Sequence, residues 1–334
     1  MTKEISKNLD QKVGLTVLLL GSTGYIGQFV KRELISRGYK VVCPVRTLSL
    51  GNNFENGKSG NFELNLSDSQ AVKQFREICP PINFIVSCIA SRTGGLKDSW
   101  EVEYKANLNI LNLAKTLDIK LFVLLSAICV QKPMLAFQKA KIAFENDLIC
   151  SGIPYSIIRP TAFFKSLSGQ VERVKQGKKF IIFDSGERTA CKPISEADLS
   201  NFICDSLVLP ERKNRILPIG GPGPSVTPRD QGELLFSLLG IKPRFQSIPS
   251  SSFSLFRAVL SPLGPVSSRI SDLREFAAIG RYYATESMLV WDSKAGEYNS
   301  TLTPEFGSHT LKEFYENVLS RGIKGQELGS HKLF

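Results

Sequence analysis

Short apolar runs alternate with amphipathic segments through the first half of the chain. The run Thr16–Leu20 leads directly into a cluster of glycines, and such continuous apolar runs are typical of strands buried on both faces of a parallel sheet. Residues 25–37 then place apolar side chains at helical spacing and stop at Gly38. The same alternation predicts further strands at 40–45, 62–64, 83–87, 121–125 and 155–158, and helices at 68–79, 100–117 and 136–150. Repeated strand–helix units of this kind predict an α/β fold with a Rossmann-like, doubly wound parallel sheet.

The second half of the chain has a different pattern. Residues 195–209 predict a helix that begins with a capping box of Ser195 and Asp198. Residues 227–239 predict another helix, with Thr227 as its N-cap and Gly240 as its stop. Between 250 and 283, two apolar helical stretches are interrupted by prolines at 262–265. We therefore expect three parts: a flexible leader at 1–14, a first domain at 15–160, and a smaller C-terminal lobe at 161–334 that is partly interleaved with the first domain.

A glycine-rich turn joins the first predicted strand to the first predicted helix. Its sequence is Gly21-Ser22-Thr23-Gly24-Tyr25-Ile26-Gly27. Glycines at this spacing permit a tight turn and a close approach of the backbone to a pyrophosphate. The helix that follows offers N–H groups and a favourable dipole to the phosphates. Because strand, turn and helix come in the required order, we expect every residue of this turn to bind a nicotinamide dinucleotide.

The end of the second predicted strand indicates which dinucleotide binds. A site for NAD usually carries Asp or Glu there, about twenty residues after the turn, to hold the ribose 2′-hydroxyl. This chain has Arg46 instead, whose guanidinium can pair with a 2′-phosphate, so we expect NADPH. Position alone places four more residues along the cofactor, two at the adenine and two further on: Asn65, Leu66, Ala90 and Ser91.

Composition narrows the class of protein. The 334 residues are 42% hydrophobic and 22% charged, as in an ordinary soluble globular protein. No apolar run approaches the roughly 18 residues that cross a bilayer, and the polar leader has no signal-peptide core, which predicts a cytoplasmic location. The seven cysteines form no Cys-x-x-Cys pair and there are two histidines, so we expect reduced thiols, no iron–sulfur cluster and no metal site.

The net charge of +11 favours an anionic ligand or surface. The basic residues are dispersed rather than gathered in a dense run, and a solvated basic surface explains the charge equally well. We expect no nucleic-acid partner. Contact with an anionic membrane surface stays open, as does the oligomeric state.

Three residues around the fifth predicted strand indicate the chemistry. Ser126 ends that strand, and Phe137 and Lys141 lie four residues apart on the next helix, so they share one helix face. Together with the glycine turn and Arg159-Pro160, this pattern resembles the extended and atypical short-chain dehydrogenases/reductases. That family carries Tyr-x-x-x-Lys on this helix. The resemblance implies that Lys141 and Ser126 are catalytic, with Phe137 in place of the tyrosine.

The missing tyrosine hydroxyl restricts the reaction. Reduction of a ketone builds an alkoxide that needs a nearby acid, and Phe137 cannot supply a proton. Either the chain binds NADPH without turnover, or its reaction does not build charge on one oxygen. Hydride addition to a conjugated C=C bond meets the second condition, because the carbanion spreads into a π-system.

Further segments resemble the divinyl chlorophyllide 8-vinyl reductases of the iron–sulfur-free type. They are 87–95 (Ser-Cys-Ile-Ala-Ser-Arg-Thr-Gly-Gly), 159–165 (Arg-Pro-Thr-Ala-Phe-Phe-Lys), 191–196 (Cys-Lys-Pro-Ile-Ser-Glu), 286–290 (Glu-Ser-Met-Leu-Val) and 325–329 (Gly-Gln-Glu-Leu-Gly). The resemblance implies NADPH-dependent reduction of the 8-vinyl group of a 3,8-divinyl chlorophyllide or protochlorophyllide to ethyl, in chlorophyll biosynthesis. With no clear transit peptide, we expect a photosynthetic bacterium, specifically a cyanobacterium, with the protein in the cytoplasm or peripheral to the thylakoid membrane.

The resemblance also implies roles for single residues. Hydride would pass directly to the vinyl terminus, with Lys141 at the nicotinamide ribose. Ser126, Lys141, Tyr155 and bulk water all stay open as the proton donor. The residues after the sixth strand that would line the nicotinamide are Pro160, Thr161 and Phe163.

A chlorophyllide is a broad apolar disc with an anionic edge, so its site should combine aromatic faces with cations. Phe137, Phe163 and Phe164 are the expected walls, and Arg92 and Lys97 the expected partners of the propionate. Core packing for the aromatic residues and solvation of the cations are the alternatives.

Two questions stay open in the sequence. The apolar stretch 253–283 is either core, a lid over the pigment, or a face resting on an anionic membrane. The rival functions are a non-catalytic NADP(H) sensor, a reductase of another conjugated alkene, and an assembly factor of a membrane complex.

Overall fold

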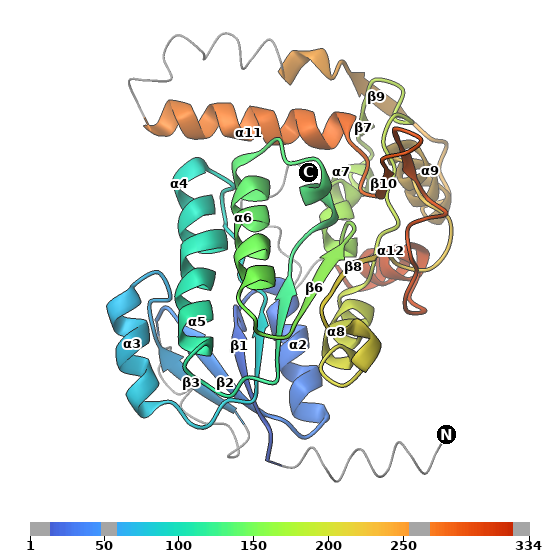
Figure 1. Ribbon diagram of the computed structural model, residues 1–334. Helices are drawn as coiled ribbons and strands as arrows, with labels where there is room; N and C mark the ends of the chain where they lie inside the picture. The colour runs from blue at the N-terminus through green and yellow to red at the C-terminus, as the bar shows by residue number, and fades with distance from the viewer. Residues whose placement is uncertain (1–13, 48–58, 254–267, 323–334) are drawn as a thin grey trace.

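The computed structural model describes residues 14–47, 59–253 and 268–322, and it is built around one parallel sheet (Figure 1). The sheet has seven strands in the order β3-β2-β1-β4-β5-β6-β8, and every pair of neighbours is parallel. The order reverses between β1 and β4, as in doubly wound folds. The strands are β1 (Thr16–Leu20), β2 (Lys40–Val45), β3 (Ser59–Glu63), β4 (Phe84–Ser87), β5 (Leu121–Leu125), β6 (Tyr155–Pro160) and β8 (Arg215–Ile219). The predicted fold class is confirmed.

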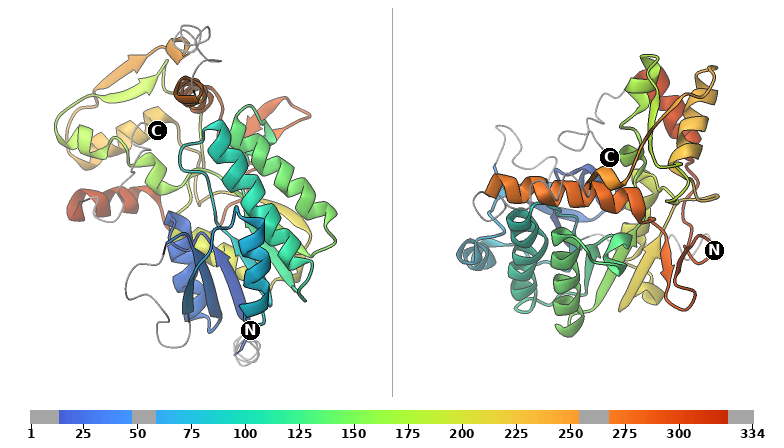
Figure 2. Two further views of the ribbon diagram at one scale, coloured as in Figure 1. Left: turned by 90° about the vertical axis from the view of Figure 1, so that its left-hand side faces the viewer. Right: turned by 90° about the horizontal axis from the view of Figure 1, so that it is seen from above.

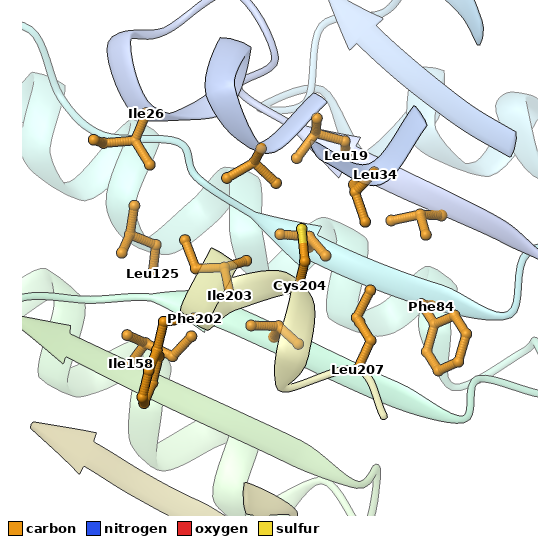
Figure 3. Close-up of a cluster of buried hydrophobic side chains, with 14 of the residues drawn as sticks. Leu19, Ile26, Leu34, Phe84, Leu125, Ile158, Phe202, Ile203, Cys204 and Leu207 are labelled. Atoms are coloured by element: carbon orange, nitrogen blue, oxygen red, sulfur yellow. The ribbon is translucent and has the colours of Figure 1, made fainter. Parts of the chain in front are cut away.

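Helices cover both faces of the sheet. On one face lie α3 (Ser69–Ile78), α5 (Asn107–Ala114) and α6 (Ala136–Cys150), whose apolar side chains form a buried cluster with the sheet. On the other face, α2 (Tyr25–Ser36) packs against α8 (Glu196–Asp205) (Figure 3). Leu34 and Ile203 in that second cluster have no exposed surface. The apolar positions of these helices therefore face the sheet, as their spacing predicted. Helix α6 has the predicted range, 136–150.

Among the elements predicted in the first half of the chain, one strand and one helix differ most from the structure. The third strand begins earlier than expected, at Ser59, because its pairing with β2 extends over residues without an apolar pattern. The helix expected at 100–117 starts with α4 (Leu96–Ser99), continues through a π-helical turn, η1 (Trp100–Ala106), and only then becomes α5. Such π-turns are rare and frequently lie at functional sites.

The second lobe has its own core. It comprises α7 (Val171–Lys175), β7 (Phe180–Phe183), α9 (Pro228–Leu238), β9 (Phe245–Ile248) and α12 (Leu311–Arg321), with β7 and β9 paired in parallel. Short turns η2 (Ile128–Gln131), η3 (Phe164–Leu167) and η4 (Pro210–Arg212) and a hairpin of β10 (Val290–Asp292) and β11 (Glu297–Asn299) complete the described elements. Thr227 caps α9 as predicted.

Two parts of the chain after 160 return to the first domain. β8 pairs with β6 as the last strand of the sheet, and α8 covers one face of it. At the start of α8, Ser195 accepts a hydrogen bond from the Asp198 N–H, as an N-cap should. The predicted reciprocal half of this capping box is wrong, because the Asp198 carboxylate instead binds the backbone N–H and ring of His309.

The long helix α11 (Ser268–Thr285) lies across the ends of α4 and α6 and runs toward the second lobe (Figures 1 and 2). All of this helix except its last two residues falls within the apolar stretch 253–283. Residues 254–267 lie outside the described residues, as do the leader 1–13 and the segment 325–329. Among the helices that the structure describes, none has both the length and the apolar character to cross a membrane.

Candidate functional site

The glycine-rich turn is closely fitted to its surroundings. Gly21 has a φ of +77°, and a Cβ there would lie 2.8 Å from the backbone carbon of Cys88. A Cβ on Gly27 would lie 2.0 Å from the Gly21 carbonyl oxygen. Any side chain at either position would push the loop away from the end of β4 or from helix α2. The glycines are therefore required by the shape of the turn.

The turn leaves the start of α2 open to an anion. Its N-cap, Gly24, contributes no side-chain hydrogen bond, and the first turn of α2 has no acidic residue. Ser22 and Ile26 are buried, whereas Thr23 and Gly24 are exposed. Backbone N–H groups at a helix start bind phosphates well, so this turn fits the pyrophosphate of a dinucleotide.

Tyr25 lies at the edge of the same turn. The Lys165 ammonium sits 4.5 Å from the centre of its ring. Burial and the neighbouring Glu196 carboxylate raise the pKa of the Tyr25 hydroxyl. Tyr25 therefore stays neutral beside the expected phosphates, where a phenolate would repel them.

Arg46 and Asn65 follow two neighbouring strands at the edge where the turn lies. Arg46 is exposed directly after β2, as a residue that meets a 2′-phosphate must be. Asn65 is also exposed and accepts a hydrogen bond from the Ser67 N–H, 3.1 Å away. The Leu66 carbonyl accepts from Asn109 at 2.9 Å while its side chain packs on the core. Asn65 and Leu66 thus form a fixed edge beside the turn.

The loop after β4 contains the next predicted residues. Ala90 is exposed, and the Ser91 N–H donates to Glu103 Oε1 at 2.8 Å. Arg92 and Lys97 are exposed, with the Arg92 backbone held by Asp98 at 2.8 Å. The backbone of this loop is therefore fixed. Arg92 is exposed on it, and Lys97 is exposed on α4, which follows it.

Lys141 is buried and paired. Its Nζ donates to Glu103 Oε2 at 2.7 Å, and Lys141 and Glu103 are 9% and 3% exposed. Glu103 lies in the π-helical turn, which brings its carboxylate between Lys141 and the Ser91 N–H. An ammonium has three donors, so two of those on Lys141 are left to bind other groups. The pair connects the loop after β4 to helix α6.

Ser126 belongs to a second buried group. Its hydroxyl donates to the Glu145 carboxylate, which also accepts both Nε (3.2 Å) and Nη2 of Arg159. Ser126 and Glu145 are 4% and 1% exposed. With its proton directed at a carboxylate, the Ser126 hydroxyl is poorly placed to donate one to a substrate.

Phe137 is one helical turn before Lys141 and faces α11. It packs against a buried cluster of Cys129, Leu135, Ile279 and Tyr282. The start of α6 is tied to α11 as well, since the Ala136 N–H donates to Glu275 at 2.7 Å. The aromatic ring at this position therefore lies under α11.

The residues after β6 separate into different environments. Pro160 and Thr161 are buried, and the Thr161 hydroxyl donates to the Lys192 carbonyl. Phe163 is half-buried beside the first core. Phe164 is 2% exposed and stacks on Phe314, 5.4 Å between ring centres, in the core of the second lobe. Because its ring is buried in that core, it has no surface left to contact a pigment. The expectation that Phe164 forms a wall of the pigment site is therefore corrected.

Tyr155 can also be placed. It opens β6, and its N–H is bound to Asn214. Parallel strands share one amino edge and one carboxyl edge, so Tyr155 lies at the opposite end of the sheet from Ser126 and Arg159. Tyr155 was one of the candidates for the proton donor, and this position at the far end of the sheet removes it from them.

Sequence reasoning missed Glu103, Glu145 and the part played by α11. A local signal for Glu145 existed, because Phe137, Lys141 and Glu145 follow one another at intervals of four residues and so share a face of α6. Glu103 carried no such signal, since an isolated Glu in a helix is normally solvated.

Burial keeps the thiols near this site in the protonated form. Burial raises the pKa of Cys88 to about 12 and that of Cys129 to about 11. Within the described ranges, no three side chains of His, Cys, Asp or Glu come together in a way that could hold a metal ion.

Comparison with known proteins agrees with this geometry. A family described as NAD(P)H-binding matches residues 21–210. The divinyl chlorophyllide a 8-vinyl-reductase of Cucumis sativus is 47% identical over 95% of this chain and 79% of its own length. This chain belongs to the divinyl chlorophyllide a 8-vinyl-reductase family. The enzyme of the same name from Oryza sativa subsp. indica is 46% identical over 96% of this chain and 82% of its own length.

More distant relatives share less. The photosystem II assembly factor Ycf39 of Trieres chinensis is 26% identical over 62% of this chain and 64% of its own length. Among solved structures, a UDP-glucose 4-epimerase from Thermotoga maritima superposes with a TM-score of 0.67 at 16% identity, covering 94% of this chain and 100% of its own. At that identity the likeness concerns the fold alone.

Proposed function

We propose that this chain reduces the 8-vinyl group of a 3,8-divinyl chlorophyllide or protochlorophyllide to ethyl, with NADPH as the reductant. The observation that supports the proposal best is the absence of a hydroxyl at Phe137 beside a retained Lys141, in a chain otherwise built like a reductase. A conjugated vinyl group accepts hydride without building an alkoxide, so it does not need the missing tyrosine.

NADPH supplies the hydride when it is bound. The turn at Gly21–Gly27 holds the pyrophosphate through its backbone, and Arg46 selects the 2′-phosphate. Lys141 uses its remaining donors on the nicotinamide ribose, while Glu103 fixes its direction. Ser126 acts through Glu145 and Arg159, which fix the ends of β5 and β6 beside the nicotinamide.

The pigment has a place beside α6 in this proposal. Phe137 and Phe163 offer half-buried aromatic surface. Arg92 is exposed on the loop after β4 and Lys97 is exposed on α4, which follows that loop, and both reach the anionic propionate. The pigment edge is thereby turned to solvent and its vinyl-bearing face toward Lys141.

The reaction itself is the direct test. Pure protein is incubated with NADPH and divinyl chlorophyllide, and the absorption shift in the blue region and the product mass are followed. We expect a product heavier by two hydrogen atoms, formed aerobically and without added metal. Binding of NADPH without any conversion would instead favour a non-catalytic sensor, and divinyl protochlorophyllide in a parallel incubation tells the two pigments apart.

The Lys141→Ala variant tests the role of the lysine. Removing the ammonium takes two hydrogen bonds from the nicotinamide ribose, so we expect NADPH affinity to fall by about tenfold, or ~1.4 kcal/mol, together with a loss of kcat. Fluorescence titration with NADPH measures the affinity separately from turnover. Full affinity and full turnover in this variant would remove Lys141 from the site.

A peripheral contact with an anionic membrane is part of the proposal. The two reductases named above are chloroplastic by name, whereas a cytoplasmic, cyanobacterial setting stays a prediction for this chain. The support is the net charge of +11 and the exposed Leu96 and Trp100 (55% and 39%) beside Lys97. Flotation with vesicles containing phosphatidylglycerol should carry the protein upward, and equal flotation with neutral vesicles would contradict the electrostatic part.

A further inference from the structure

Two short segments lie side by side at one end of the second lobe. The first, residues 175–179, leads from the end of α7 toward β7, and the second, residues 240–244, leads from α9 to β9. Arg244 Nη2 donates to the Gly177 carbonyl, and the Phe180 N–H donates to the Arg244 carbonyl at 2.9 Å. These bonds hold the two segments together, and we call them the lobe tip.

The lobe tip is densely positive. Both segments are exposed throughout and contain no Asp or Glu. Their cations are Lys175, Lys178, Lys179, Lys242 and Arg244. Within the ranges that the structure describes, none of these cations forms an ion pair. The nearest carboxylate along the chain, that of Glu172, accepts from Gln176 at 3.5 Å instead. The positive charge of the lobe tip is therefore uncompensated.

The two segments border an open hollow of about 550 Å³. Its lining combines apolar side chains with cations, and the residues are Val174, Leu239, Ile241, Lys175, Lys242 and Arg244. Ile241 is 41% exposed at this surface. Lysine and arginine can lay their apolar stems along such a surface while their charged ends stay in water. The hollow therefore suits a partner that is anionic at its surface and apolar beneath it.

The lobe tip lies away from the residues expected to react. Strands β7 and β9 are parallel, so both begin at the lobe tip and run away from it (Figure 2). After β9, the Phe253 ring lies 2.5 Å from where a Cβ on Gly280 of α11 would be. The lobe tip is thus at the opposite end of this strand pair from α11. A partner bound at the tip would leave α11 and the residues beneath it uncovered.

The composition of the lobe tip favours a membrane over a folded protein as the partner. The cores of protein interfaces are enriched in aromatic residues and depleted of lysine, whereas the tip has four lysines and no aromatic residue. An anionic bilayer attracts exposed lysines and arginines, and each one near the surface strengthens binding about fivefold. The exposed Ile241 adds an apolar side chain that can enter the interface.

We propose that the lobe tip binds the headgroups of anionic membrane lipids, with Ile241 entering between them and the surrounding lysines on their phosphates. This inference rests on the proposed function, because it names the surface that makes the membrane contact. At α4, Lys97 is followed directly by Asp98, so the lobe tip has the larger uncompensated charge. A broad apolar pigment partitions into a bilayer, and the lobe tip holds the enzyme beside it.

Flotation with vesicles containing phosphatidylglycerol tests the assignment. The tip variant carries Lys175→Gln, Lys178→Gln and Lys242→Gln. At about fivefold for each charge, its partition onto the vesicles should fall about a hundredfold. The matched control removes three exposed lysines from the first domain, by Lys73→Gln, Lys115→Gln and Lys120→Gln. It loses the same net charge, but its partition should fall less than about fivefold.

A second measurement reports the position of the lobe tip directly. Ile241→Cys is labelled with an environment-sensitive fluorophore, in a background in which Cys79 and Cys150 are replaced by Ser. Phosphatidylglycerol vesicles should shift its emission to shorter wavelengths, because the label enters the interface. Neutral phosphatidylcholine vesicles should leave the emission unchanged. Circular dichroism and thermal unfolding of the tip variant should match the wild type, since the replaced lysines form no ion pairs.

The outcomes separate this inference from the proposed reduction. A wild-type protein that converts no pigment contradicts the reduction, whatever the flotation shows. A protein that converts pigment, but whose tip variant floats like the wild type, overturns the assignment of the lobe tip alone. Loss of flotation through Leu96→Ser with Trp100→Ser, at an unchanged emission of the Ile241→Cys label, places the contact at α4 and also overturns it. Binding to soluble polyglutamate but not to vesicles would identify an acidic protein as the partner instead.

Discussion

The cofactor half and the reaction half of the site are built in opposite ways. At the glycine turn, shape comes from backbone alone: Gly21 and Gly27 bring loop, strand and helix together, and the start of α2 has no side-chain cap. Around α6, shape comes from charged side chains that are already paired, Lys141 with Glu103 and Arg159 with Glu145. One half leaves its donors available for a ligand, whereas the other satisfies most of its groups internally.

Because of this difference, substitutions in the cofactor half should mainly affect ligand binding, and substitutions in the reaction half should mainly affect the stability of the fold. A change in the glycine turn disturbs the ligand's partners first. A change in the buried pairs leaves an unpaired charge in the protein, which costs free energy of unfolding before any ligand is present. The following variants test that separation.

The largest effect is expected from Glu145→Gln. This change leaves the Arg159 side chain, which is 17% exposed, without its buried carboxylate partner, and breaking a buried pair costs about 3–5 kcal/mol of unfolding free energy. Denaturant unfolding measures it. The matched control is Glu316→Gln, which breaks the exposed pair with Lys312 (3.8 Å) and should cost less than about 0.5 kcal/mol. Equal losses in both variants would mean that burial of the pair has no consequence.

Gly27→Ala should affect both properties. The new Cβ meets the Gly21 carbonyl at 2.0 Å, so the loop has to move, at a cost of about 1–3 kcal/mol. Because the moved groups bind the pyrophosphate, NADPH affinity should fall by more than the loss of stability accounts for, and calorimetric titration measures this. Gly38→Ala is the control, since it has a positive φ of +86° but no atom within 4 Å of its Cβ. A normal affinity for NADPH in Gly27→Ala would contradict the fit of the turn.

Arg46→Ala should change selectivity without changing stability. Losing a charge-assisted bond to the 2′-phosphate costs about 1.5–3 kcal/mol, so the Kd for NADPH should rise about 10- to 100-fold. The Kd for NADH should stay within about twofold, because NADH lacks that phosphate. Parallel titrations with the two cofactors give the ratio. An equal loss for both would mean that Arg46 does not distinguish them.

The smallest effect concerns thiol reactivity near the reaction half. Thiolate is the form that reacts, and burial raises the pKa of Cys129 to about 11 and of Cys191 to about 12, whereas Cys150 is exposed. Iodoacetamide at pH 8 should label Cys150 and spare the other two. Raising the pH to about 9.5 should still spare them, since it stays below both values. Peptide mass mapping measures the labelling, and early modification of Cys129 would contradict its burial.

Local patterns predicted most of the first domain. The apolar run at β1, the glycines after it and the helical spacing of α6 are each encoded within a few consecutive residues. β8 was not predicted, because Arg215 and Ile216 are exposed at the edge of the sheet and the strand exists only through pairing with β6. Its inward face consists of Leu217 and Ile219, too few residues for periodicity to detect.

The residues of the candidate site likewise fall into two groups, those that local sequence could predict and those that only the fold brings together. The glycine turn, Arg46 and Lys141 could be found because their roles follow from neighbours in the sequence. Glu103 is 38 residues away from Lys141 along the chain, so only the fold brings the two together. The Asp198 carboxylate shows the opposite error: a local capping role was expected, but His309, 111 residues away, takes it.

The π-helical turn at Trp100–Ala106 makes the site depend on the length of the chain as well as on its chemistry. A π-turn closes its hydrogen bonds one residue later than an α-turn, and so accommodates one extra residue. Deleting a single codon there would restore an ordinary helix with its flanking segments in place, and would change the direction of the residues within the turn. Glu103 would then point away from Lys141 with no amino acid replaced at either position. Gains and losses of this site in evolution can therefore be sought in one-residue insertions and deletions.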